Sequence, residues 1–173
     1  MAKQVIAEGR FLRFVNDGGW EYVERCRVSG VIAIVAISRD QKIILVEQYR
    51  PPIQARTIET PAGLAGDIAG QEHEKLITAA ERELDEETGY RGGEWQEMGT
   101  SASSAGLTTE MITFFSAINV ERHGTGGGDE SENIVVHEIP LTELRSWLAT
   151  KAAAGLIVDH KIYAGLSMAG ITF

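Results

Sequence analysis

The chain has 173 residues, of which 43% are apolar and 24% charged, as expected for a soluble globular protein of one domain with a small appendage. Its formal net charge of -9 repels phosphate backbones, so no nucleic acid is expected as a partner. Cys26 is the only cysteine, which excludes an intrachain disulfide and suits a reducing, cytoplasmic compartment. The sequence shows neither a membrane-spanning run nor a signal peptide, so no membrane is expected as a partner either.

Hydrophobic patterning predicts strands and helices in alternating blocks. Strands are expected at 4–25 (two or three strands, with a turn at 16–19), 31–37, 42–48, 57–60, 94–101, 111–120 and 133–139. Helices are expected at 72–88, 141–153 and 159–168, with Gly89 and Asp159 as cap residues, and a mobile loop at 124–128. This order indicates an α/β (α+β) fold, with a mixed sheet between helices and a small N-terminal antiparallel β segment.

Acidic residues crowd the end of the first expected helix. The acids there are Glu81, Glu83, Asp85, Glu86 and Glu87. Like charges three and four positions apart repel and weaken an isolated helix. A divalent cation can offset this repulsion, because Mg²⁺ takes carboxylate, water and phosphate oxygens. The alternative is a solvated helix face without a ligand.

The helical wheel favours the cation. At about 100° per residue, the apolar stripe consists of Leu76, Ile77, Ala80 and Leu84. Glu87 falls inside this stripe and Glu83 at its edge, where a carboxylate is costly without a partner. Arg82 can pair with Glu86, which leaves Glu83 and Glu87 for a cation.

The run from Arg82 to Tyr90, which reads Arg-Glu-Leu-x-Glu-Glu-x-Gly-Tyr, resembles the core of the Nudix box. That signature is Gly, five residues, Glu, seven residues, then Arg-Glu-apolar-x-Glu-Glu-x-Gly-apolar. Glu74 matches the upstream Glu and Gly89 the closing Gly. Gly63 resembles the leading Gly, although ten residues separate it from Glu74. An insertion is therefore expected at 65–70.

The flanking stretches 45–50, 58–63 and 155–159 resemble the ADP-ribose and nucleotide-sugar pyrophosphatases of this family. The resemblance implies a metal site made by Glu83 and Glu87, with Glu86 assisting and the carbonyl of Ala62 as a further ligand. It also implies that Arg50 faces the substrate phosphates, where the planar guanidinium suits bidentate contact.

Other substrate contacts and the catalytic base are expected elsewhere in the chain. Glu110 is an expected substrate contact, and so is an arginine at position 28, but the sequence carries Val28 there. The loop after 124–128 holds Glu130, expected as the general base, with Glu132 as second choice. Glu86 counts as a further catalytic candidate.

The resemblance implies Mg²⁺-dependent hydrolysis of a nucleoside diphosphate linked to another group, with Mn²⁺ as a substitute metal. ADP-ribose, giving AMP and ribose 5-phosphate, is the favoured substrate. Ala105 stands where ADP-ribose-type members carry Pro, so UDP- or GDP-sugars remain alternatives, followed by nucleoside triphosphates, dinucleotides and coenzyme A. A non-catalytic nucleotide sensor is the alternative of a different class; such proteins usually lack some motif acids, which this chain retains.

The N-terminal segment, residues 1–27, is expected to pair two copies of the chain, and residues 28–173 to form the Nudix hydrolase domain. Its large apolar residues are Phe11, Leu12, Phe14, Trp20 and Tyr22. A short hairpin is marginal alone and must pack on something, so a homodimer is expected. The alternative is that the hairpin folds back on its own domain.

Overall fold

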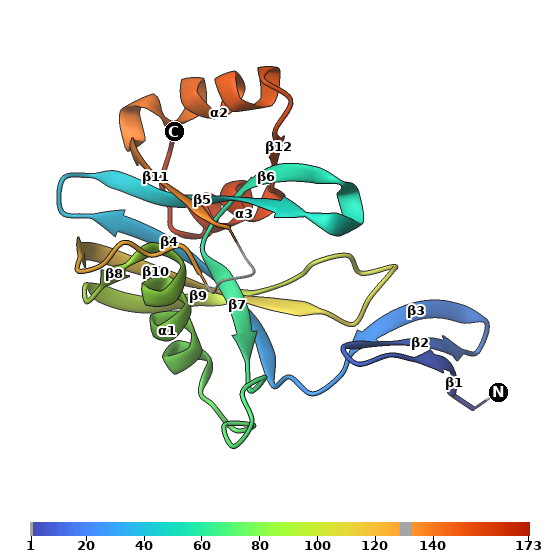
Figure 1. The fold of residues 1–173 in the computed structure, drawn as a ribbon. Helices are drawn as coiled ribbons and strands as arrows, with labels where there is room; N and C mark the ends of the chain where they lie inside the picture. Colours follow the sequence, from blue (N-terminus) through green and yellow to red (C-terminus); the bar gives the residue numbers. More distant parts are fainter. Residues whose placement is uncertain (1, 129–132) are drawn as a thin grey trace.

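The computed structural model describes residues 2–128 and 133–173 (Figure 1). A three-stranded N-terminal sheet contains β1 (Gln4–Glu8), β2 (Leu12–Asp17) and β3 (Trp20–Arg25) in antiparallel order. The main sheet contains β4 (Gly30–Ser38), β5 (Lys42–Arg50), β6 (Ala55–Glu59), β7 (Ala62–Ala65), β8 (Tyr90–Arg91), β9 (Glu94–Ala102), β10 (Met111–Arg122), β11 (Val135–Pro140) and β12 (Ile157–Val158). The helices are α1 (Leu76–Thr88), α2 (Leu144–Ala153) and α3 (His160–Met168), with short 3-10 turns at Pro51–Ile53 and Leu141–Glu143.

The main sheet is mixed, as the sequence predicts. Its order is β12-β6-β5-β4-β10-β8, while β11 pairs with β5, β7 with β4 and β9 with β10. The pairs β4–β10 and β6–β12 are parallel, and the other pairs are antiparallel. Among the described residues, no helix is long and apolar enough to cross a membrane.

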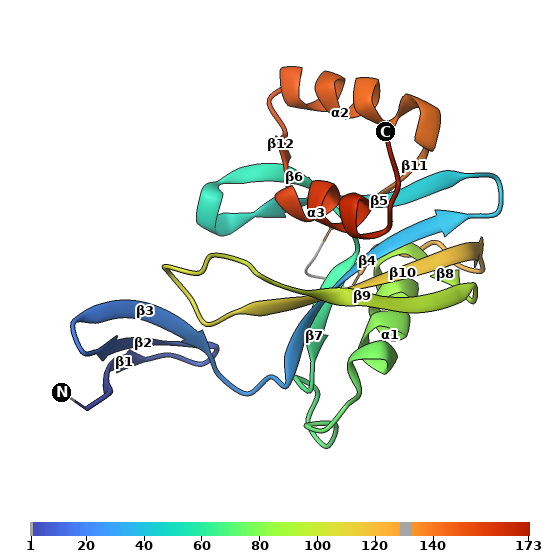
Figure 2. The ribbon, with the colours of Figure 1, turned by 180° about the vertical axis from the view of Figure 1, so that it is seen from behind.

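Helices cover both faces of this sheet, with α1 on one side and α2 and α3 on the other (Figures 1 and 2). Strand β4 shows why its sequence is apolar throughout. Ile32 and Ile34 pack with Leu84 of α1, whereas Val35 and Ile37 pack with the core under α2 and α3. Successive side chains of a strand point to opposite faces, so a strand buried on both faces needs an unbroken apolar run.

Helix α1 ends where predicted and begins later than predicted. Gly89 adopts φ 72°, and its N–H donates to the carbonyl oxygen of Asp85 at 2.8 Å. The expected start at 72 is wrong: residues 71–74 form turns, and the helix starts after Lys75 without a side-chain cap. The glycine stretch after Thr60, read as a loop from sequence, contains strand β7.

The glycine-rich segment 124–128 is tied to the end of α1. The N–H groups of Gly127 and Gly128 donate to the carbonyl oxygens of Glu87 and Glu86, at 2.8 and 3.0 Å. The last carbonyls of a helix have no partner within it, so these glycines supply the missing donors. The expected free loop is therefore anchored at this end. Glu130 and Glu132 lie outside the described residues.

The N-terminal sheet projects from the body of the molecule (Figures 1 and 2). It touches the connection between β9 and β10: the N–H of Val23 donates to the carbonyl oxygen of Leu107 at 2.9 Å, and that of Thr109 to Val23 at 3.2 Å. Phe11 and Trp20 remain 62% and 70% exposed. The hairpin therefore leaves much of its apolar surface uncovered within one chain.

Candidate active site

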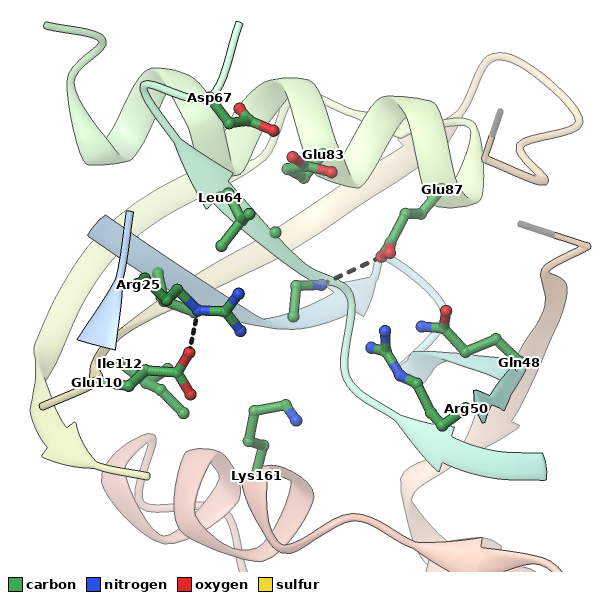
Figure 3. Close-up of a pocket in the computed structure, with 13 residues that line it drawn as sticks. Arg25, Gln48, Arg50, Leu64, Asp67, Glu83, Glu87, Glu110, Ile112 and Lys161 are labelled. Carbon is green, nitrogen blue, oxygen red and sulfur yellow. Dashed lines mark hydrogen bonds and ion pairs between the residues drawn. The ribbon is translucent and has the colours of Figure 1, made fainter. Parts of the chain in front are cut away.

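A cavity of about 310 Å³ opens between α1, β7 and the strand ends of the main sheet. Its charged lining divides into two walls (Figure 3). Asp67, Glu83 and Glu87 lie on the side of α1, and Arg25, Arg50 and Lys161 lie across β7 from them. The remaining lining residues are Val31, Gln48, Ala62, Gly63, Leu64, Glu110 and Ile112.

The acidic wall is built from one helix turn and the strand beneath it. Glu87 is only 4% exposed, and its carboxylate accepts the N–H of Ala62 at 3.1 Å. Gly63 leaves room for the other carboxylate: a Cβ added there would lie 2.1 Å from the Cδ of Glu83. The motif glycine is therefore required by close approach of the helix side chain to the backbone of β7.

Arg82 holds the base of this wall together. Its guanidinium contacts Glu74 at 3.2 Å, Glu83 at 2.9 Å and Glu86 at 3.1 Å, and donates to the carbonyl oxygen of Leu64 at 3.0 Å. The predicted pair with Glu86 is confirmed. The expectation that Glu83 has only a cation as partner is wrong, because Arg82 reaches it from the neighbouring position. Glu74 and Arg82 thus anchor β7 and the insertion to α1.

Burial raises the pKa of Glu83 to about 7, although the charge of Arg82 acts in the opposite direction. The negative charges of Glu86 and Asp67 add to the rise. A carboxylate that is desolvated beside like charges is stabilised by a bound cation. The donor set therefore fits a divalent metal held by Glu83 and Glu87, completed by water and substrate oxygens. The described residues contain no group of three or more His, Cys, Asp or Glu side chains arranged to hold a metal, so the two carboxylates alone do not complete a coordination shell.

The basic wall comes from three separate segments. Arg25 at the end of β3 contacts Glu110, which precedes β10. Arg50 at the end of β5 donates from Nε and Nη2 to Glu59, at 2.6 and 2.8 Å. Lys161 in the first turn of α3 is 14% exposed, with its Nζ 2.6 Å from Asp159. Cations placed opposite carboxylates suit a ligand that carries both a metal ion and phosphate groups.

The structure brings several predicted residues together and leaves others apart. Those that line the cavity are Glu83, Glu87, Ala62, Gly63, Arg50 and Glu110. Glu86 does not line it, since its side chain is 54% exposed and faces Arg82. Position 28 also lies outside it, and Val28 carries no charge for a phosphate.

Sequence reasoning missed Arg25, Asp67 and Lys161 on the cavity wall. Arg25 reaches the site because the N-terminal sheet joins the connection before β10. Asp67 comes from the insertion. Lys161 could have been found from its neighbour, since Asp159 was read as the helix N-cap; its carboxylate accepts the N–H of Lys161 at 2.7 Å.

The class of protein is defined by a mixed sheet between helices and by helix α1, whose carboxylates line a cavity with one acidic and one basic wall. The model of the NUDIX domain matches residues 27–159, and the chain belongs to the Nudix family. It is a Nudix hydrolase, and enzymes of this kind generally need a divalent metal.

Curated relatives are similar over most of the chain. A methanol dehydrogenase activator of Bacillus methanolicus is 33% identical over 129 residues, or 74% of this chain and 67% of that protein. An ADP-sugar pyrophosphatase of Mus musculus is 31% identical over 193 residues (96% and 85%). An ADP-ribose pyrophosphatase of Bacillus subtilis is 32% identical over 153 residues (83% and 78%).

A solved structure of an ADP compounds hydrolase has the same fold. It superposes with a TM-score of 0.63 at 20% sequence identity, covering 84% of this chain and 81% of that chain.

Proposed function

We propose that this hydrolase cleaves the diphosphate of ADP-ribose with Mg²⁺, giving AMP and ribose 5-phosphate. The observation that carries the proposal is the two-walled cavity, with Glu83 and Glu87 facing Arg50 across β7. Two relatives named for ADP-ribose and ADP-sugars support the substrate class. A nucleotide sugar is the second candidate, favoured by the ADP-sugar relative and by Ala105.

In this proposal Glu83 and Glu87 hold the metal, with Mn²⁺ as a substitute and the carbonyl of Ala62 as a further ligand. A bound Mg²⁺ supplies charge neutralisation of the diphosphate and activation of a water. Arg50 binds and orients a phosphate of the substrate. Water adds to phosphorus, the bridging P–O bond breaks, and each product leaves as a phosphate monoester.

Glu130 is the proposed general base, with Glu132 as the second candidate. Gly128 supports this choice, because its N–H is bonded to the carbonyl oxygen of Glu86 and the chain therefore enters 129–132 at the end of the motif helix. Glu86 keeps a supporting role through its contact with Arg82.

We also propose that residues 1–27 pair two copies of the chain, with residues 28–173 as the hydrolase domain. The uncovered Phe11 and Trp20 support this, and so does a second cavity of about 300 Å³ next to the N-terminal sheet. Trp20 and Tyr22 line it together with Thr108 and Thr109. The protein is expected to act in the cytoplasm, without nucleic-acid or membrane partners.

A substrate panel tests the proposed activity. ADP-ribose, ADP-glucose, GDP-mannose, UDP-glucose, a dinucleoside diphosphate, ATP and coenzyme A are incubated with enzyme and Mg²⁺, and the nucleotide products are separated by ion-exchange chromatography. We expect kcat/KM for ADP-ribose to exceed that of each other compound by about tenfold or more, the range that pocket contacts supply. A higher value for a nucleotide sugar would replace ADP-ribose as the substrate.

A further inference from the structure

The hairpin of β5 and β6 carries two ion pairs of equal length on opposite faces. Arg50 Nε lies 2.6 Å from Glu59, and Arg56 Nε lies 2.6 Å from Glu47. Alternation along β5 separates them: Gln48 and Arg50 line the cavity, whereas Glu47 meets His137 and Lys151 on the other face. One pair therefore belongs to the active site, and the other is a natural control.

Glu59 is almost completely buried, with 1% of its surface exposed. Its carboxylate accepts two hydrogen bonds from Arg50 and one from Thr57 Oγ1 at 2.5 Å, and Lys161 Nζ lies 3.4 Å away. Burial raises the pKa of Glu59, but these partners more than offset it and keep the pKa below its ordinary value. A charged carboxylate thus sits behind two cations that face the cavity.

Both cations keep donors for a ligand. A guanidinium has five N–H donors, of which Glu59 accepts two from Arg50. The ammonium of Lys161 has three, and Asp159 accepts one of them at 2.6 Å. Asp159 is itself fixed, because its N–H donates to the carbonyl oxygen of Ile58 at 2.9 Å. The positions of Arg50 and Lys161 therefore both depend on strand β6.

We propose that Glu59 is a positioning residue that holds Arg50 and Lys161 as a two-cation clamp for a phosphate of the substrate, with Lys161 a substrate-binding residue. The proposal rests on the proposed function. Glu59 and Asp159 balance the charges of Arg50 and Lys161, and the donors that both cations keep are directed to the cavity opposite the acidic wall. Glu59 aims both cations at the space between the walls, so its loss removes orientation and leaves the positive charge in place.

Kinetics with ADP-ribose test this clamp through the variants Glu59→Gln, Lys161→Met and Arg50→Lys. We expect each to raise KM by about 10- to 100-fold, the effect of a lost charge-assisted hydrogen bond, with kcat changed less than about threefold. Arg50→Lys keeps the charge but loses the planar guanidinium and its paired N–H donors, so we expect it to raise KM as Glu59→Gln does. Arg56→Gln is the matched control: it breaks a pair of equal length and should leave KM unchanged.

Glu59→Gln separates positioning from simple neutralisation. If Glu59 only cancelled charge, its removal would make the cavity more positive and would lower KM for an anionic substrate. A lowered or unchanged KM, with a melting temperature reduced as in Arg56→Gln, would overturn the proposal. Titration calorimetry with inorganic pyrophosphate and Mg²⁺ gives an answer independent of turnover. Even if ADP-ribose is no substrate, weaker pyrophosphate binding by Glu59→Gln and Lys161→Met would support the clamp, and unchanged binding would reject it.

Discussion

Single residues of the acidic wall were predictable where one helix determines them. Helical geometry alone placed Glu87 in the apolar stripe, and it is buried against β7. The same geometry could not reveal that Arg82 donates to the carbonyl oxygen of Leu64, because β7 was not recognised as a strand. Contacts across elements, such as Arg50 with Glu59, depend on strand register, which a single sequence leaves open.

The metal assignment predicts a specific pattern of lost affinity. Glu83→Gln and Glu87→Gln should weaken Mn²⁺ binding, measured by calorimetry, by at least about tenfold, since even outer-shell changes cost metals 10–100-fold. Glu81→Gln, at an exposed position of the same helix, is the control and should bind normally. Normal Mn²⁺ affinity in both Glu83→Gln and Glu87→Gln would refute the metal site.

The general-base assignment predicts a different result. Glu130→Gln should retain Mn²⁺ binding while kcat falls by roughly 10²–10⁴-fold, as for a general base.

At the scale of elements, the long periodic segments were predicted well and the short ones were not. The buried strands β4, β5 and β10 have unmistakable apolar runs. Strand β7 has only four residues, directly follows Pro61 and includes Gly63, so its local signals favour a loop. Pairing with β4 overrides these signals. The two-residue strands β8 and β12 have no signal of their own and form only because longer strands lie beside them.

Glu47 joins three elements, and this junction makes stability depend on pH. Burial acts to raise the pKa of Glu47, but hydrogen bonds from Arg56 of β6, His137 of β11 and Lys151 of α2 lower it to about 2. Because the folded-state pKa lies below the unfolded value near 4.5, Glu47 stabilises the fold above about pH 4.5. This stabilisation is lost as the pH falls towards 2. The melting temperature of wild type should therefore fall more steeply between about pH 5 and pH 2 than that of Glu47→Gln. Parallel curves would show that Glu47 does not contribute.

For the whole molecule, the sheet between helices followed from element order, and the cavity did not. Its lining comes from the N-terminal sheet, the insertion, α1, α3 and strands β4, β5, β7 and β10, so no local window of sequence contains it. The N-terminal sheet was predicted as a separate β segment, and the structure places Arg25 from it at the site. The proposed pairing of two copies through this sheet would therefore take place close to the cavity.

Light scattering after gel filtration tests the proposed dimer. We expect about twice the mass of 18.8 kDa at micromolar concentration. Trp20→Lys should shift the mass towards the monomer, because it places a charge in the largest exposed apolar group of the N-terminal sheet. Ile53→Lys is the control, since Ile53 is 51% exposed in the turn between β5 and β6, outside the N-terminal sheet. A wild-type mass near 18.8 kDa would exclude the dimer.

The central claim, hydrolysis of ADP-ribose at its diphosphate, is tested most directly by product analysis. Wild-type enzyme, ADP-ribose and Mg²⁺ should give AMP and ribose 5-phosphate in equal amounts by ion-exchange chromatography, and removal of Mg²⁺ with EDTA should stop both. Glu87→Gln under the same conditions should form neither product at a comparable rate. Release of ADP, equal rates with EDTA, or no product from wild type would contradict the proposed function.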